Sequence, residues 1–248
     1  MLSRVADNLY WMARYLERTE NLARLVDVSA GLMAEATAKR TRYAFLGHVT
    51  SCTQTLTGMF EGIFNEGDAL SFLSIGRNIE RADMTSRIVD VRAAAMMVTV
   101  NAEELRPFET VLWMSVLRSL SGYQMYRLKT RERVHGPGVV RFLLAEDQFP
   151  RACVCCLRRI EEVLHRLPNS ETLVRRVARM RRALHHTRFE TLERGALHDF
   201  IDRLQLSLAR TNDELARIYF VGHSAPVSAI APIVAYQNQN KHITARKL

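Results

Sequence analysis

Proline and glycine are scarce in this 248-residue chain, which has six prolines and eleven glycines. Long stretches therefore run without a strong helix breaker. No segment shows sustained alternation of apolar and polar residues between turn signals, so a β-sheet is not expected. Long helices joined by short loops predict an all-α fold, an antiparallel helical bundle with no sheet.

Long apolar runs are also missing. No stretch approaches the ~20 apolar residues that span a bilayer. Met1 leads directly into a helical pattern without the organisation of a signal peptide. Since apolar residues make up 48% and charged residues 25% of the chain, the composition is that of a soluble globular protein. We expect no membrane span and a cytoplasmic location.

Cysteine is rare, and three of the four cysteines crowd into one stretch as Cys153, Cys155 and Cys156. Cys153 and Cys156 form a C-x-x-C pattern. A structural zinc site would need two more thiolate or imidazole ligands with recognisable spacing, and none is evident. We therefore interpret these cysteines as small apolar residues that pack one face of a buried helix.

Signatures of catalysis and of cofactors are absent as well. Glu162 and His165 form one E-x-x-H pair, and Glu132 and His135 form another that abuts Gly136-Pro137-Gly138. A di-iron bundle needs two such motifs and two further glutamates. No dinucleotide-binding, phosphate-binding-loop or nucleophile-elbow motif occurs. The sequence predicts no metal and no cofactor, and favours a protein that is not an enzyme acting alone.

One helical element, in contrast, is present twice. Residues 7–30 and 70–93 align without a gap and share the pattern R-x-x-E-R-x-x-x-x-x-R-x-V-D-V-x-A. Shared polar positions are harder to obtain by chance than shared leucines, so we interpret the two segments as a duplicated helix. The central residues of the repeated motif are Arg14, Glu17, Arg18, Arg77, Glu80 and Arg81.

The first copy carries apolar residues around nearly its full circumference, which predicts burial. Buried charges must be paired, so Glu17 and Glu80 should be buried within reach of arginine. Two interpretations stay open. The favoured one is a structural ion-pair network that fixes how the two helices meet. The other is an anion site, in which the arginines bind phosphate or carboxylate and the glutamates orient them.

The helices expected along the chain cover about residues 3–35, 41–65, 68–100, 107–134, 139–144, 147–167, 172–187 and 197–220. After Phe220 the composition changes to serine, proline, glutamine and asparagine. Residues 1–220 are therefore predicted to form a single domain, and residues 221–248 a disordered or loosely packed tail.

Positive charge is unevenly distributed in a chain with a net charge of +9, because ten arginines and three glutamates lie between Arg151 and Arg188. A basic surface can meet an acidic protein, nucleic acid or anionic lipid. Aromatic stacking residues and a known reading module are missing, so nucleic acid is the less favoured partner. The predicted basic partner face is formed by Arg175, Arg176, Arg179 and Arg182.

Three stretches carry a family resemblance: MLSRVADNLYWMARYLERTENLARLVDV, GRNIERADMTSRIVDV and RFLLAEDQFPRACVCCLRRIEEVL. They resemble the bacterial alpha-E family, helical proteins named for an E-R motif, over residues 1 to about 220. The segment from about 39 to 68 is shorter than in the family. The resemblance implies an all-helical protein whose genes accompany, or are fused to, ATP-grasp ligase-like and transglutaminase-like proteins. It supplies no catalytic residue.

These observations lead to one functional hypothesis and two alternatives. The leading hypothesis is a helical accessory or scaffold protein that works with an ATP-grasp ligase-like or transglutaminase-like partner in forming or modifying a peptide or amide bond. One alternative is a basic nucleic-acid-binding module. The other is a small-molecule enzyme that uses the E-R arginines as an anion site. The oligomeric state is left open by the sequence.

Overall fold

A computed structural model of the chain describes residues 2–33, 39–65, 67–95, 102–192 and 194–220. The predicted tail, residues 221–248, lies outside these residues. All regular structure within the described ranges is helical, with no strand, which confirms the predicted all-α fold. The helices are α1 (Ser3–Met33), α2 (Lys39–Ile63), α3 (Asp68–Ala95), α4 (Ala102–Ser119), α5 (Tyr123–Lys129), α6 (Gly136–Ala145), α7 (Cys153–Leu164), α8 (Glu171–His186) and α9 (Arg194–Tyr219).

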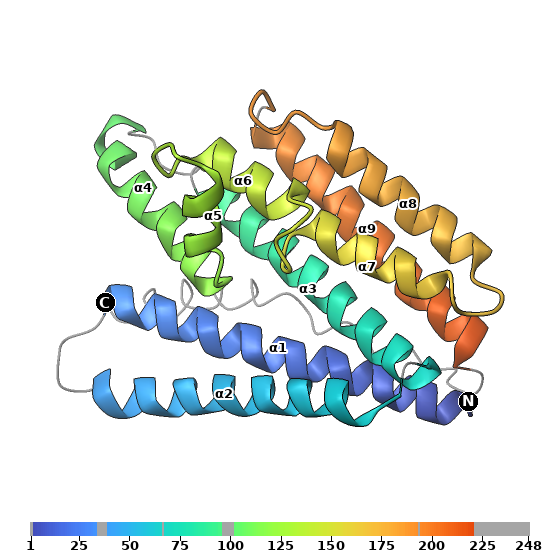
Figure 1. Cartoon of the computed structure of the whole chain (residues 1–248). Coiled ribbons are helices and arrows are strands. Elements are labelled where there is room, and N and C mark those ends of the chain that lie inside the picture. The colour runs from blue at the N-terminus through green and yellow to red at the C-terminus, as the bar shows by residue number, and fades with distance from the viewer. Residues whose placement is uncertain (1, 34–38, 66, 96–101, 193, 221–248) are drawn as a thin grey trace, which may run out of the picture.

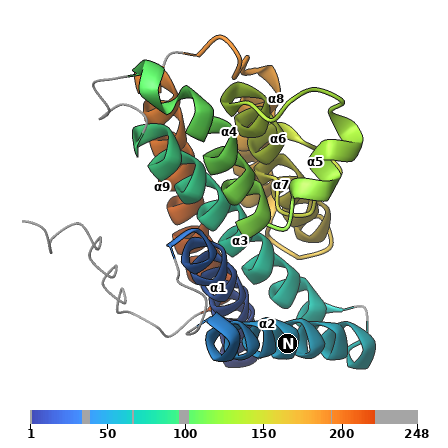
Figure 2. The same ribbon diagram turned by 90° about the vertical axis from the view of Figure 1, so that its left-hand side faces the viewer.

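The duplicated helix provides α1 and α3, and these two helices pack against each other (Figure 1). Helix α2 returns antiparallel to α1, so the pair forms a hairpin along one side of the molecule. Helix α3 occupies the centre, where it contacts α1, α4, α6, α7 and α9. Helices α6 to α9 form the body on the far side of α3 (Figure 2), and α9 also contacts α1 directly.

The closest approach of α1 and α3 depends on Gly76. A Cβ atom added there would lie 2.4 Å from the backbone oxygen of Tyr10, far inside van der Waals contact. Ala13, the equivalent residue of the first copy, is also buried. Small residues at this repeated position let the two backbones touch, which brings the charged residues one turn further along within reach of each other.

The single helix predicted over residues 107–134 was wrong, because two helices, α4 and α5, occupy this stretch. The chain turns at Ser121, which has a left-handed φ of 54°. The N–H of Gly122 then donates to the Leu117 carbonyl at 2.7 Å. A Cβ at Gly122 would lie 2.9 Å from the Phe149 ring. The turn therefore needs a glycine for space, and the Ser-Gly pair was its overlooked signal.

The three clustered cysteines lie in the core, as the sequence predicted. Cys153, Cys155 and Cys156 are buried and free, and Cys52 is exposed. Burial raises the pKa of the Cys156 thiol to about 12. This thiol is therefore protonated at neutral pH and acts as a packing residue.

Within the described residues, no helix is long and apolar enough to cross a membrane.

Candidate functional site

The glutamates of the two E-R motifs bind arginines of the opposite copy. Glu80 of α3 accepts from Arg18 Nε at 2.6 Å, and Glu17 of α1 forms an ion pair with Arg81 Nε at 2.8 Å. Each glutamate thus binds the arginine that directly follows the other glutamate. Both carboxylates are buried, with exposures of 3% for Glu17 and 0% for Glu80. The prediction of buried, arginine-paired glutamates is confirmed.

The symmetry of this exchange stops at the first arginine of each motif. Arg14 donates from Nε to Glu80 Oε2 at 2.8 Å. Its counterpart Arg77 turns away from Glu17 and donates to Glu61 of α2 at 2.6 Å. Glu61 is 59% exposed at its side chain. The structure therefore brings five of the six predicted motif residues together and places Arg77 outside the network.

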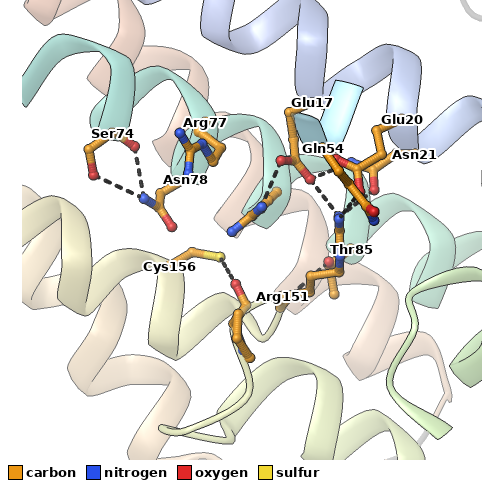
Figure 3. A network of polar contacts seen from close by, with 12 residues as sticks. Glu17, Glu20, Asn21, Gln54, Ser74, Arg77, Asn78, Thr85, Arg151 and Cys156 are labelled. Carbon is orange, nitrogen blue, oxygen red and sulfur yellow. Dashed lines mark hydrogen bonds and ion pairs between the residues drawn. The ribbon is translucent and has the colours of Figure 1, made fainter. Parts of the chain in front are cut away.

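Arg151, from the turn before α7, takes the place that Arg77 leaves at Glu17. Its Nη1 lies 2.5 Å from Glu17 Oε1, and its Nη2 donates to Glu20 at 3.0 Å (Figure 3). Its own carbonyl accepts from Thr85 of α3 at 2.8 Å. The charge pattern of the sequence predicted that Arg151 belongs to the basic surface region. This prediction was wrong, because the residue is 7% exposed. The available signal was its position within the apolar run Phe149-Pro150-Arg151-Ala152-Cys153.

Neutral side chains complete the network. Arg14 donates to Asn212 Oδ1 of α9 at 2.9 Å, and Tyr10 donates to the same oxygen at 2.7 Å. Asn21 accepts from Arg151 at 2.5 Å. Glu20 binds Arg24 and accepts from Gln54 of α2 at 3.3 Å. The network therefore joins α1, α2, α3, α9 and the turn before α7.

Electrostatics favour the ionised forms in the network. Burial alone would raise the pKa of Glu17, but the charges of Arg81 and Arg151 outweigh it and hold this pKa below its usual range. Burial would likewise lower the pKa of Arg81, but the charge of Glu17 and their hydrogen bond raise it. Burial raises the pKa of Tyr10 to about 12, so its hydroxyl stays a donor at neutral pH. Glu17 and Arg81 therefore form an ionised pair near pH 7.

The arginines of the network outnumber its carboxylates. Five guanidinium groups (Arg14, Arg18, Arg24, Arg81 and Arg151) meet three carboxylates (Glu17, Glu20 and Glu80). Oxygens of Asn212, Asn21 and Tyr10 take up part of the excess donor capacity. Nη1 of Arg24 remains buried without a hydrogen-bond partner. The network therefore holds two more guanidinium groups than carboxylates, and part of its donor capacity is unused.

Two surface cavities lie elsewhere, and neither is lined by Arg14, Arg18 or Arg81. The smaller, about 220 Å³, lies where α2, α3 and α7 meet and is lined by Arg77, Arg166, Glu61, Ser71 and Ser74, among others. The larger, about 960 Å³, lies beside α5 and α6 and carries charges of both signs, including Lys129, Arg141 and Glu190.

Only part of the predicted basic face is exposed to solvent. Arg175, Arg179 and Arg182 are exposed along α8. Arg176 is turned toward α9, where it donates to Glu214 at 2.6 Å. The next residue on the exposed stripe is His186, so we define the basic stripe as Arg175, Arg179, Arg182 and His186.

Each E-x-x-H pair has its own local contacts. Glu162 of the first pair binds Arg158 at 2.5 Å, and His135 of the second lies 3.6 Å from Glu132 of the same pair. Among the residues that the structure describes, no group of three or more His, Cys, Asp or Glu side chains is placed to hold a metal ion.

The paired E-R helices are also what relates this chain to known proteins. The Alpha-E family, described as a predicted alpha-helical domain with a conserved ER motif, matches residues 1–43 and 32–220. The chain belongs to this family. The two matched segments overlap at residues 32–43, and the match ends at Phe220, where the predicted tail begins. No curated protein and no solved structure matches the chain.

Proposed function

We propose that this Alpha-E protein is a helical accessory or scaffold protein that binds an ATP-grasp ligase-like or transglutaminase-like partner in forming or modifying a peptide or amide bond. The observation that carries the proposal is the ionic network between the two E-R helices. The charged side chains of the family motif bind one another across α1 and α3. The motif therefore holds α1 and α3 together. In this proposal its role is to maintain the fold that presents a docking surface to a partner.

The family resemblance names the class of partner. It implies that genes of alpha-E proteins often accompany, or are fused to, those of ATP-grasp ligase-like and transglutaminase-like proteins. An accessory role then requires a docking surface on this chain. A protein with a net charge of +9 is attracted to an acidic surface at long range, and charge complementarity raises the association rate.

The basic stripe on α8 fits this requirement. Arg175, Arg179 and Arg182 recur at intervals of four and three residues, so they lie on one side of the helix. They are exposed, and none of the intrachain salt bridges described above involves them. Such a row presents free guanidinium donors, which bind carboxylates in bidentate pairs.

Charge reversal tests this docking surface. Arg175, Arg179 and Arg182 are changed together to glutamate, and co-purification with the neighbouring ATP-grasp-like or transglutaminase-like protein is measured at one fixed salt concentration. We expect the triple variant to lose the partner. The matched control reverses Arg127, Arg131 and Arg133, which are equally exposed near α5, and should retain it.

Nucleic-acid binding is measured on the same proteins. The accessory role predicts weak, length-insensitive retention of the wild type on single-stranded and duplex nucleic acid, since both are held by nonspecific charge contacts. Tight, sequence-selective binding together with unchanged co-purification of the triple variant would contradict the proposal and favour the nucleic-acid module.

A second candidate function rests on the cavity of about 220 Å³ beside Arg77. Two arginines and two serines line it near the N-terminus of α3, a combination that suits a small anion. Glu61 occupies one face of Arg77, so an anion would have to compete with this carboxylate. Titration calorimetry with inorganic phosphate tests it: binding lost in Arg77→Gln and kept in Arg175→Gln supports the site, and absence of heat in the wild type eliminates it.

A further inference from the structure

The hairpin of α1 and α2 has one face that the rest of the described chain leaves uncovered. Helix α2 packs chiefly against α1, and Thr53 is the one buried residue in the part of α2 whose side chains are described. Four of its large apolar side chains are exposed instead: Phe45, Leu56, Met59 and Ile63. At about 100° per residue these four fall within an arc of about 60°, so they form a single stripe.

Helix α1 carries a matching stripe. Tyr15, Leu22 and Val26 are about half exposed, and by the same rotation they lie roughly opposite Glu17. This corrects the sequence-based reasoning that α1 is buried all round. Glu17 points toward α3, so the stripe of α1 faces away from α3.

The stripe of α2 faces the same way. Gln54 and Glu61 reach the α3 side of the hairpin, where they bind Glu20 and Arg77. Phe45 and Ile63 lie about 160–180° around the helix from them. The two stripes therefore form one continuous surface, which we name the hairpin face. The contact of Gln54 with Glu20 also sets the antiparallel register, which places Tyr15 beside Met59.

The hairpin face is unusual in its lack of charge. Between Ala44 and Ile63 the sequence of α2 contains one charged residue, Glu61, which is turned to the opposite side. A helix that stays in water normally has a polar outer face, and contiguous exposed apolar surface marks an interaction site. Charged residues are depleted at the core of protein interfaces in the same manner.

We propose that the hairpin face binds a second copy of this chain, so that two α1–α2 hairpins form an intermolecular four-helix bundle about a two-fold axis. Self-association through most surfaces is opposed by the net charge of +9. The apolar stripe of α2 adds no like-charge contact of its own to that repulsion. On α2 the stripe runs from Phe45 to Ile63, so a copy rotated by 180° brings Phe45 of one chain toward Ile63 of the other.

The available area agrees with a dimer. The stripe of α2 from Phe45 to Ile63 is about 27 Å long, the stripe of α1 from Tyr15 to Val26 is about 17 Å long, and each helix is about 10 Å wide. Two such faces would bury about 900 Å² in total, which is the size of a weak or transient interface. The dimer should therefore dissociate on dilution. This inference is independent of the proposed accessory role.

Sedimentation equilibrium over a range of concentrations tests it on the full chain. We expect a mass that rises toward twice the 28.4 kDa of one chain. Leu22→Glu and Met59→Glu should each raise the dissociation constant by roughly tenfold or more, because a carboxylate would be buried unpaired. The control is Leu206→Glu on α9, where the leucine is 57% exposed against 47% for Leu22; it should dimerise like the wild type.

Cys52 provides a second measurement. It is the exposed cysteine and falls in the same arc of α2 as Met59. Its alkylation rate should fall as the wild-type concentration rises, and should stay constant in Leu22→Glu. A wild type that stays monomeric, or a dimer that both glutamate variants leave intact, would overturn the proposal. A monomer with a protected Cys52 would also overturn it and assign the face to residues 221–248.

Discussion

The two copies of the E-R helix have the same motif and different surroundings. Helix α3 is covered by five other helices, whereas α1 contacts chiefly α2 and α3 and leaves one face open. Even so, the exchanged pairs Glu17–Arg81 and Glu80–Arg18 are alike. Residues at the contact between α1 and α3 thus have equivalent ion-pair partners in the two copies. Residues that point away from this contact bind whichever helix or turn lies beside them.

Arg14 and Arg77 illustrate this division most clearly. They are equivalent in sequence, yet Arg14 reaches Glu80 and Asn212, and Arg77 reaches an exposed glutamate of α2. The vacancy at Glu17 is filled by Arg151. Single substitutions at equivalent positions of the two copies test this division of roles.

The largest effect is expected from Glu80→Ala. This change would leave Arg14 and Arg18 without their shared carboxylate, and breaking a buried ion pair costs about 3–5 kcal/mol. Urea unfolding followed by circular dichroism measures the free energy. Glu61→Ala is the control, since its carboxylate is largely exposed and exposed pairs contribute under about 1 kcal/mol. Equal losses in the two variants would mean that the network carries little stability.

Equivalent arginines should respond unequally. Arg14→Met removes a charged hydrogen bond to a buried carboxylate, and we expect a loss of about 1.5–3 kcal/mol. Arg77→Met removes the pair with Glu61 and should cost less than about 1 kcal/mol. Both are measured by urea unfolding. Similar losses of unfolding free energy in the two variants would mean that Arg14 and Arg77 contribute equally to stability, despite their different partners.

Two glycines in helices should give effects of opposite sign. Gly76→Ala forces a methyl group against the Tyr10 carbonyl, and overpacking of this kind costs about 1–3 kcal/mol. The methyl group added by Gly58→Ala on α2 meets nothing within 4 Å. The higher helix propensity of alanine should therefore stabilise the protein by up to about 1 kcal/mol. Thermal unfolding of both variants tests this pair. Stabilisation by Gly76→Ala would show that α1 and α3 can separate freely.

The sequence predicted the duplication, the all-helical fold and the burial of Glu17 and Glu80, because these depend on periodicity and on the cost of an unpaired buried charge. It could not predict that Arg151 joins Glu17, since that pairing spans 134 residues and depends on how the turn before α7 meets α3. It also missed the exposed stripe of Leu22 and Val26, because apolar character alone does not distinguish a covered face from an uncovered one.

The smallest effect concerns acid sensitivity and Glu17. Arg81 and Arg151 hold the pKa of Glu17 below the value of 4.5 that it has in an unfolded chain. The unfolded state therefore binds the proton more readily, so the stability from Glu17 is complete above about pH 5 and is lost as pH falls through the folded-state pKa. Stability of the wild type should decline on acidification below pH 5 more steeply than that of Glu17→Gln.

Slopes of unfolding free energy against pH make this comparison, because Glu17→Gln also lowers stability at neutral pH and absolute values would mix the two effects. Glu61→Gln removes an exposed carboxylate of the same chemistry and should leave the slope close to that of the wild type. If Glu17→Gln had the wild-type slope, the proton would be taken up elsewhere, and the pairing of Glu17 with Arg81 and Arg151 would not determine the acid limit of the fold.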